Sequence, residues 1–528
     1  MPSGWPQVIV EGGFVTTKPV QAAGTLLLDD ATYGLLGTGT LGGAATYSDL
    51  SAWVRSGTVT RPCTRQQGPL YSYSPGTAAI VLNNKDGRFD PGNLGGPYVA
   101  AGATELTAMT PVRLRAVWGG ISYPLFDGYA DGWADDGVNY AGHYAQTTLT
   151  ATDAQKVLQG INLAAISPAG AGEATGTRVN RILTAAGWYT GTGKRVLAPG
   201  DSGLQATTFG DTAWNLMALA SDSEIGELYV RGDGAVVFRN RHAILTDARS
   251  TAPQGVFGDV PGAAETAGTE LAYRSVTRAR DDATVANDVQ ATRAGGTLQE
   301  ASDQASIDRY LFARTYTRSD LLLTADPETL TWAQWILYIA KADEDRFDQL
   351  VLYPLRDPVN LWPHALGREV GDRIQVWRRP PHVLDTTAPW TITSTGDTLG
   401  PSYIPVTTAD AAKVNIGDQF QLYTSGGAPK DQAQWPLTVV ALPPPFVGIV
   451  NVTFDKTLVT WVNNLDTAVQ VTGAIVKDCF IRGISHDFDV SAGTWATTWT
   501  LQDASRYGSF WTLDQPILGK LDQNALAY

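Results

Sequence analysis

Alternating apolar and polar positions dominate the chain and predict short β-strands joined by tight turns. Ala78 to Leu82 form an apolar run that ends in the turn-forming cluster Asn83 to Gly87, and Phe89-Asp90-Pro91 then stops the pattern. From Pro111 to Phe126, two alternating arms flank Gly119-Gly120, which predicts a hairpin whose second arm, containing Pro124, is an edge strand. Leu228 to Phe238 predicts another hairpin, with its turn at Arg231 to Gly234. These patterns predict a mainly β fold.

Helical spacing is confined to a few segments. Val179, Ile182, Leu183 and Ala186 follow the i, i+3, i+4, i+7 spacing of an amphipathic helix that Gly187 ends. A second helix is expected after Asp211, and the longest is expected from Leu330 to Lys341. The helices therefore predict a smaller α/β part beside the β-rich parts.

The order of these patterns, in a chain too long for one hydrophobic core, predicts several domains. Residues 383–475 are rich in Thr, Val and Pro, lack helical spacing, and interrupt a strand pattern that resumes at Cys479, so we expect an inserted β module there. The predicted parts are a β domain with an N-terminal arm at 1–150, a small α/β domain at 151–262, a second β domain with a helix at 263–382 plus 476–510, the inserted module at 383–475 and a C-terminal arm at 511–528.

Composition excludes some classes of protein. The net charge of −14 argues against a protein that wraps nucleic acid, which needs Lys and Arg against the phosphates. Cys63 and Cys479 are too few for a disulfide framework or a zinc site, although one bridge between them stays open. With so few cysteines, synthesis in the cytoplasm is expected. No run of about 20 apolar residues occurs, and the first residues do not resemble a signal peptide.

Three short motifs resemble catalytic or cofactor-binding signatures but lack the residues that the chemistry needs. Gly37 to Gly42 fits G-x-G-x-x-G without the acid about twenty residues later, and Gly191 to Arg195 has Arg195 where a phosphate loop needs Ser or Thr. Gly200-Asp201-Ser202-Gly203 matches the surroundings of a protease nucleophile, but His143, the histidine that precedes it, is in no matching motif. We expect a loop or a turn at each of them, and no catalytic residue or cofactor.

Metal-binding and adhesion motifs are also weak. None of the five histidines has a partner at metal-ligand spacing, and we expect solvated turns rather than calcium sites at the acid pairs Asp29-Asp30, Asp135-Asp136 and Asp281-Asp282. Arg231-Gly232-Asp233 spells an adhesion tripeptide, but the hairpin turn explains it. We therefore predict no metal.

A short repeat links the two ends of the chain. Both copies read L-D-x4-G-x-L, one at 28–36 and one at 513–521, and such a match also arises by chance in a chain rich in Leu and Gly. The functional interpretation is an arm at each end that clips onto a neighbouring subunit. The candidate assembly residues are Leu28, Asp29, Gly34, Leu513, Asp514, Gly519 and Leu521.

Several ordered blocks resemble the minor tail proteins of long-tailed (siphovirus-type) actinobacterial phages, the family of the tail-tip or baseplate hub. The likeness covers most of the chain outside 383–475. Its blocks are SAWVRSGTVTRPCTRQQGPLYSYSPGTAAIVLNNKDGRFDP (51–91), PVRLRAVWGGISYPLFDGYADGW (111–133), LYVRGDGAVVFRNRH (228–242), NDVQATRAGGTLQEASDQASIDRYLFARTYT (287–317), IRGISHDFDVSAGTWATTWTLQDAS (481–505) and WTLDQPILGKLDQNAL (511–526).

The resemblance implies a structural, non-enzymatic virion protein. Three copies would form a ring below the tail tube, with two tube-like β domains per subunit, at 1–150 and in the 263–510 region, that continue the DNA channel. An acidic lumen would let DNA pass without binding it. The implied partners are further copies of the chain, the distal tail protein, the tape measure protein and other tip or fibre proteins, with host contact through 383–475.

Two other functions remain open at this level. The chain could be the distal tail protein, a six-fold ring one layer up, or a tail-associated hydrolase of cell wall or glycan. Length and the middle α/β part favour the hub over the distal tail protein, and no linear motif supplies an acid pair or a nucleophile for a hydrolase.

Overall fold

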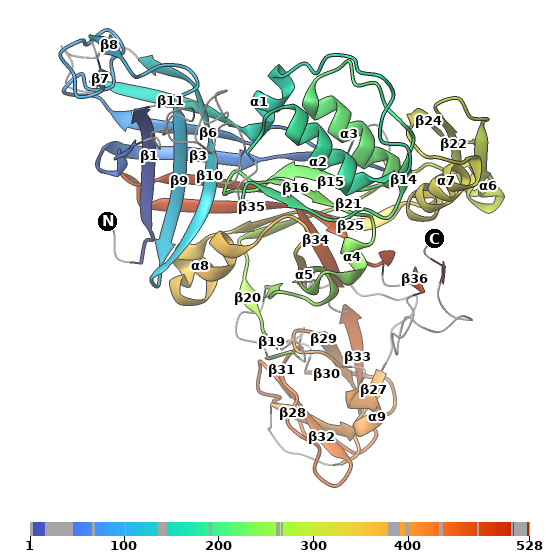
Figure 1. Cartoon of the computed structure of the whole chain (residues 1–528). Coiled ribbons are helices and arrows are strands. Elements are labelled where there is room, and N and C mark those ends of the chain that lie inside the picture. The colour runs from blue at the N-terminus through green and yellow to red at the C-terminus, as the bar shows by residue number, and fades with distance from the viewer. Residues whose placement is uncertain are drawn as a thin grey trace. The chain divides into compact units, whose positions relative to one another are not determined.

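The computed structural model is mainly β and multidomain, as the residue pattern predicts (Figure 1). It describes residues 4–15, 46–65, 69–100, 102–135, 145–189, 193–259, 264–265, 268–378, 391–396, 402–412, 414–431, 434, 437–472, 475–507, 510–511 and 525–526. The chain forms two compact units. Unit 1 comprises Met1–Thr251, Thr277–Asp372 and Phe480–Tyr528, and unit 2 comprises Ala252–Val276 and Arg373–Cys479. The predicted boundaries of the smaller domains remain predictions.

One large antiparallel sheet organises unit 1. Its strands lie in the order β2-β1-β9-β10-β11-β6-β3-β34, and β34 continues through β35 and β25 to β21. Their bounds are β1 (Gln7–Val15), β2 (Thr46–Asp49), β3 (Val54–Arg61), β6 (Thr77–Asn83), β9 (Pro111–Trp118), β10 (Ile121–Asp135), β11 (Gln146–Asp153), β21 (Ser275–Asp281), β25 (Glu344–Leu352), β34 (Ile475–Asp489) and β35 (Thr494–Asp503). The chain passes between the units within β21 and within β34.

The predicted 111–126 hairpin is confirmed as the β9–β10 pair, joined at Gly119 and Gly120, which both have positive φ. Pro124 lies in β10 before Gly128, where pairing with β11 begins. This part of β10 therefore has β9 as its only described neighbour, as a proline within a strand requires.

One pairing joins an early strand of the chain to a late one. Strand β3 runs antiparallel to β34 from Ser56, opposite Asp489, to Arg61, opposite Ile484. Strand β3 also pairs with β6 on its other side, so the predicted Ala78 to Leu82 strand is an interior strand. Residues more than four hundred positions apart thus share one sheet.

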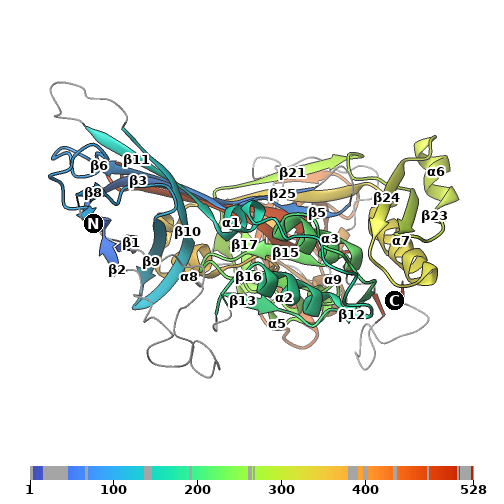
Figure 2. The same cartoon turned by 45° about the horizontal axis from the view of Figure 1, so that its top comes forward.

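A small α/β part follows β11 in the chain. Strands β15 (Glu227–Val230) and β16 (Val236–Arg239) form the predicted hairpin, and β13 (Arg195–Leu197) adds to β16 in parallel. The helices α1 (Ala154–Gly160), α2 (Thr175–Ala185) and α3 (Ala213–Glu224) pack beside it (Figure 2). Helix α3 begins one residue later than expected, because Thr212 accepts the capping hydrogen bond from the backbone of Asn215.

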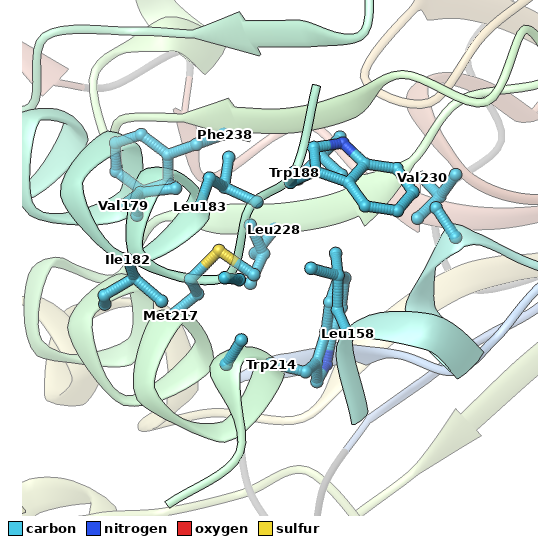
Figure 3. Close-up of a cluster of buried hydrophobic side chains, with 14 of the residues drawn as sticks. Leu158, Val179, Ile182, Leu183, Trp188, Trp214, Met217, Leu228, Val230 and Phe238 are labelled. Carbon is cyan, nitrogen blue, oxygen red and sulfur yellow. The ribbon is translucent and has the colours of Figure 1, made fainter. Parts of the chain in front are cut away.

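The core of this part contains the apolar residues that set the helical spacing in the sequence. Figure 3 shows the side chains of α2 and α3 turned toward those of β15 and β16. The labelled members are Leu158, Val179, Ile182, Leu183, Trp188, Trp214, Met217, Leu228, Val230 and Phe238. Burial of this apolar surface holds the helices against the hairpin.

A second helical part of unit 1 packs α7 (Asp326–Ala340), the predicted long helix, on a three-stranded sheet. Its strands are β22 (Asp288–Arg293), β23 (Gln299–Ser302) and β24 (Thr315–Leu321), with α6 (Gln304–Tyr310) between β23 and β24. The remaining elements of unit 1 are β4 (Cys63–Arg65), β5 (Tyr71–Tyr73), β7 (Val99–Ala100), β8 (Ala103–Thr104), β12 (Glu173–Ala174), β14 (Gly203–Leu204), α4 (Ala243–Thr246), α5 (Ala248–Thr251), α8 (Pro358–Gly367), β36 (Phe510–Trp511), β37 (Ala525–Leu526) and the short 3₁₀ helices Ser51–Trp53 and Pro354–Arg356.

Unit 2 contains the predicted β module, built on its own apolar core. Its main sheet has the order β27-β33-β29-β31-β32-β28, with β30 beside β29. Its elements are β17 (Val256–Gly258), β18 (Ala264–Glu265), β19 (Gly268–Thr269), β20 (Leu271–Ala272), β26 (Arg373–Arg378), β27 (Thr391–Thr393), β28 (Tyr403–Thr407), α9 (Thr408–Ala411), β29 (Gln419–Tyr423), β30 (Pro429–Lys430), β31 (Leu437–Ala441), β32 (Ile449–Phe454) and β33 (Thr467–Thr472).

Two further findings bear on the sequence predictions. Cys63 and Cys479 are both buried thiols, so the bridge that the sequence left open is not formed. Within the described part of the chain, no helix is both long enough and apolar enough to cross a bilayer.

Candidate functional site

The loop that resembles a protease nucleophile motif holds a buried carboxylate. Gly200 has φ +88°, and the backbone N–H of Ser202 donates to Oε2 of Glu224 at 3.4 Å. Burial raises the pKa of Glu224, although hydrogen bonds from Thr175 and from the backbone of Asp201 and Ser202 act in the opposite direction. The motif therefore anchors the C-terminal end of α3 to the start of α2.

No nucleophilic triad is assembled there. His242 Nδ1 lies 2.9 Å from Asp201 Oδ2, but none of the described histidines hydrogen-bonds the hydroxyl of Ser202. His143, the base considered in the sequence, lies outside the described residues. The arrangement is a surface His–Asp pair beside a structural turn, which does not activate a serine.

The other motifs also have structural explanations. Lys194 donates to Oδ2 of Asp127 at 3.0 Å and to the carbonyl of Asp233 at 2.9 Å, so this lysine ties the β15–β16 turn to β10. In that turn Arg231 Nε donates to Asp233 Oδ1 at 3.0 Å. The two charged side chains of the adhesion-like tripeptide therefore bind each other. The glycine-rich segment 37–42 lies outside the described residues.

Among the described residues, no three His, Cys, Asp or Glu side chains are placed so that they could hold a metal ion. Asp281 pairs with Arg346 and Asp282 pairs with Arg314, so this acid pair is neutralised by arginines. His486 is buried and His364 is half-buried, each near an arginine, and burial lowers the pKa of His364 to about 4 and that of His486 to about 3. Of the other candidates, Asp29, Asp30, Asp136 and His382 lie outside the described residues.

A buried ionic cluster fastens the α/β part to the large sheet. Arg482 of β34 is 2% exposed and pairs with Glu227 of β15, and its Nε donates to Oε1 of Gln502 at 2.6 Å. Glu227 Oε2 also accepts from Arg239 at 2.8 Å. Burial raises the pKa of Glu227, but Arg482 and Arg239 more than offset this effect and hold the pKa below its usual value. The cluster stabilises the junction and holds no open reactive group.

An exposed ion-pair network covers the outer edge of the large sheet. Five of the seven residues of β21 are exposed, and β25 is its only strand partner among the described elements. Arg278 pairs with Asp345 at 2.6 Å and Arg280 with Asp343 at 2.7 Å. A hydrogen bond from Tyr310 and the charge of Arg280 lower the pKa of Asp343 to about 2.

This β21–β25 edge is the strongest candidate for a functional surface in unit 1. Charged side chains on an edge strand oppose unspecific pairing with the strands of other proteins. The unpaired backbone groups of the strand can still bind a partner whose charges are complementary. Sequence reasoning missed the edge and the Arg482 cluster. The charges of segment 275–281, SVTRARD, were the available signal for the edge, whereas Arg482 carries no sign of its burial.

The candidate assembly residues of the repeat cannot be placed. Leu28, Asp29 and Gly34 near the start and Leu513, Asp514, Gly519 and Leu521 near the end lie outside the described residues. Their assembly role remains a prediction.

Comparisons with known proteins give structural neighbours only. No protein-family model and no curated protein matches the chain. The fold is similar to that of a tail protein from Neisseria meningitidis MC58 (TM-score 0.47, 9% identity, 95% of this chain and 97% of that chain). It is also similar to the 43 kDa tail protein of prophage MuSo2 from Shewanella oneidensis (TM-score 0.39, 11% identity, 88% and 97%) and to prophage tail protein gp18 from Listeria monocytogenes EGD-e (TM-score 0.34, 8% identity, 78% and 91%). Because these TM-scores are low, we infer the function from the residues of this chain.

Proposed function

We propose that the chain is a structural subunit of the tail-tip hub of a long-tailed phage, where a ring of copies continues the channel of the tail tube. The observation that carries this proposal is the β3–β34 pairing. The sequence blocks that resemble the hub family, 51–91, 111–133 and 481–505, are separate in the chain and yet all supply strands of one sheet, in which β11 alone stands between β10 and β6. If early and late parts of the chain together form the wall of the channel, they must share a sheet in this way.

The open edge of this sheet supports assembly into a ring. The two ends of the sheet in unit 1 are β2 and β21, which are different surfaces of one subunit. A contact between unlike edges is heterologous, and it closes into a ring when the rotation between subunits divides a full turn. We propose a homotrimer on this principle, with the terminal arms at 28–36 and 513–521 reaching the neighbouring copies.

The charges fit a channel rather than a binding site for DNA. The net charge of −14 opposes phosphate binding, so DNA would pass without specific contacts. The distal tail protein, the tape measure protein and other tip or fibre proteins are the proposed neighbours, and the 383–475 module is the proposed host-facing part. In this proposal the chain is made in the host cytoplasm, resides in the virion at the tail tip, and catalyses no reaction.

Mass and location test the proposal together. The subunit mass is 56.3 kDa, so we expect light scattering of the purified full chain to give about three times that mass. Labelling of intact particles should place it at the tail tip. Six copies in a ring above the tip would instead identify the distal tail protein. Release of sugar or peptide from purified host wall, lost in Ser202→Ala, would support the hydrolase and contradict the structural role.

A further inference from the structure

A run of exposed apolar residues forms one turn of the 383–475 module, just before and at the start of β32. Residues 443–449, PPPFVGI, contain no polar side chain, and each of them is exposed. Phe446 is 82% and Val447 is 85% exposed, the two highest values among the large apolar side chains that the structure describes. A run of more than three or four exposed apolar residues opposes solubility, so it is expected only where it has a function.

The turn fixes these side chains in a conformation that its own sequence disfavours. The backbone N–H of Phe446 donates to the carbonyl of Ile449 at 2.8 Å, and the N–H of Ile449 donates back at 3.1 Å. Between them Val447 and Gly448 have φ +51° and +79°, as in a type I′ turn. Asn or Gly favours the first of these positions, whereas a β-branched residue is strained there. Val447 therefore lowers the stability of the turn and gains no burial, which points to a function outside the fold.

The segment around the turn is uncharged and apolar. From Val439 to Val450 no side chain donates or accepts a hydrogen bond, and the run without charge extends from residue 432 to residue 454. Two other elements contact the turn. Ile449 pairs with Thr407 of β28, and the backbone N–H of Thr408 in α9 donates to the carbonyl of Gly448 at 3.1 Å. The one charged residue of these two elements is Asp410 of α9, which is half-buried.

We propose that the 443–449 turn inserts into the hydrocarbon of a lipid bilayer with zwitterionic headgroups. Hydrocarbon disfavours backbone N–H and C=O groups that have no partner. The three prolines have no N–H, and the turn pairs both backbone groups of Phe446 with those of Ile449. The carbonyls of the prolines stay hydrated at the level of the headgroups, so only the tip from Phe446 to Ile449 enters.

A bilayer fits this turn better than a protein partner. A protein interface surrounds its apolar centre with a polar rim and forms about one hydrogen bond per 100–200 Å². The 439–450 segment supplies no side chain for such bonds, and hydrocarbon needs none. The headgroups are zwitterionic in this proposal because Asp410 and the net charge of −14 oppose an anionic surface.

Flotation of the full-length protein with lipid vesicles tests this proposal. The probe is phosphatidylcholine vesicles in a density gradient, at about 0.1 M and about 1 M sodium chloride. The Debye length falls from about 10 Å to about 3 Å between these conditions, so binding through charge would weaken while apolar insertion would not. We expect flotation that high salt does not reduce and that added phosphatidylglycerol does not strengthen.

Val447→Asn is the most informative variant, because Asn-Gly is the preferred pair in a type I′ turn. It should have a melting temperature at least as high as that of the unmodified chain, and yet its vesicle affinity should fall about tenfold or more. Phe446→Ser should reduce the affinity at least as much. The matched control is Val459→Asn, since Val459 is 72% exposed in the same module and follows the other end of β32. This variant should float as the unmodified protein does.

Three results would overturn the proposal: no flotation of the unmodified protein, equal flotation of Val447→Asn, or loss of flotation at high salt. A fourth is capture of a purified tail protein by the unmodified chain but not by Val447→Asn, without flotation of either. That result would assign the turn to a protein interface.

This inference rests on the host-facing role proposed above for the module, but the two can fail separately. A ring has one such turn per copy at equivalent positions, so weak single insertions add up to stronger binding. A monomer in light scattering would contradict the ring, whereas an unchanged flotation of Val447→Asn would contradict the bilayer site alone.

Discussion

Arg482 and Glu227 form a buried ion pair between the large sheet and the α/β hairpin, although 255 residues separate them in the chain. Arg482 belongs to a sequence block that resembles the hub family, 481–505, and Glu227 directly precedes another, 228–242, so the pair joins these two parts of the chain in space. Glu227 shares its second oxygen with Arg239, so one carboxylate compensates two buried guanidinium groups.

Removal of one member of this cluster should be costly. Glu227→Gln leaves Arg482 buried without its counter-charge and leaves Arg239 with only its pair to Asp247, and we expect the free energy of unfolding of unit 1 to fall by about 3–5 kcal/mol. Urea unfolding followed by tryptophan fluorescence measures the change. The control is Arg314→Met, which breaks the exposed pair with Asp282 and should cost less than about 1 kcal/mol. Equal effects of the two substitutions would contradict the structural role of the cluster.

Local patterns account for the elements that the sequence predicts well. The 111–126 hairpin, the 228–238 hairpin and the long helix that ends near Lys341 each repeat an apolar period over neighbouring residues, and all three are present. Such a period depends on one face of the segment being buried, whatever covers it.

The tertiary pairings leave no comparable signal. Strand β3 alternates in the same way whether β34 or another strand lies beside it, because the pairing is made by backbone groups. Arg482 lies between Ile481 and Gly483, and this local sequence predicts an ordinary strand with a solvated arginine side chain. Its burial is decided by the hairpin that packs on the sheet, and this long-range contact is invisible in a local window.

Gly200 gives a prediction that separates a structural loop from a catalytic one. Its φ of +88° disfavours any side chain, and a Cβ there would lie 2.8 Å from the backbone nitrogen of Gly176. We expect Gly200→Ala to destabilise the protein by about 1–3 kcal/mol, measured by urea unfolding. Ser202→Ala should change stability little, because the backbone N–H of Ser202 makes the bond to Glu224. A large loss from Ser202→Ala alone would refute this interpretation of the loop.

Asp153 should make stability depend on pH below neutrality. Burial raises its pKa from 3.8 to about 7, against the opposing effect of the backbone N–H groups of Gly76 and Gln155. Because the native state retains its proton between these values, this group lowers stability as the pH rises from about 4 to about 7, by up to about 4 kcal/mol. Asp153→Asn should remove this slope in unfolding measurements across that range. Asp131→Asn, at an exposed carboxylate, serves as the control and should leave the slope in place.

His486 acts in the opposite direction. This residue of β34 is buried, and its Nδ1 shares a hydrogen bond with the hydroxyl of Thr497 at 3.1 Å. Burial, and to a smaller extent the charge of Arg61, lowers its pKa to about 3. The unfolded state takes up a proton below about pH 6.5 and the native state does not, so stability falls with decreasing pH, by about 2 kcal/mol at pH 5. His486→Gln should flatten this part of the unfolding profile, and an unchanged profile in this variant would contradict the buried neutral histidine. Comparison with Asp153→Asn separates the two opposing slopes.

Charge reversal on β21 tests the ring contact without removing the fold. The pairs Arg278–Asp345 and Arg280–Asp343 are exposed, and exposed pairs contribute at most about 1 kcal/mol each, so Arg278→Glu with Arg280→Glu should leave unit 1 folded. If β21 is the surface that meets the next copy, four like charges at this edge oppose the contact, and light scattering should give the 56.3 kDa monomer.

Arg314→Glu is the matched control, since it reverses a charge that is exposed to a similar degree to Arg278 but lies outside β21. It should assemble as the unmodified chain does. A full-size assembly of the double variant, with an unchanged melting temperature, would place the ring contact elsewhere. Because the double variant remains folded, a loss of mass would report the contact itself and not a loss of structure.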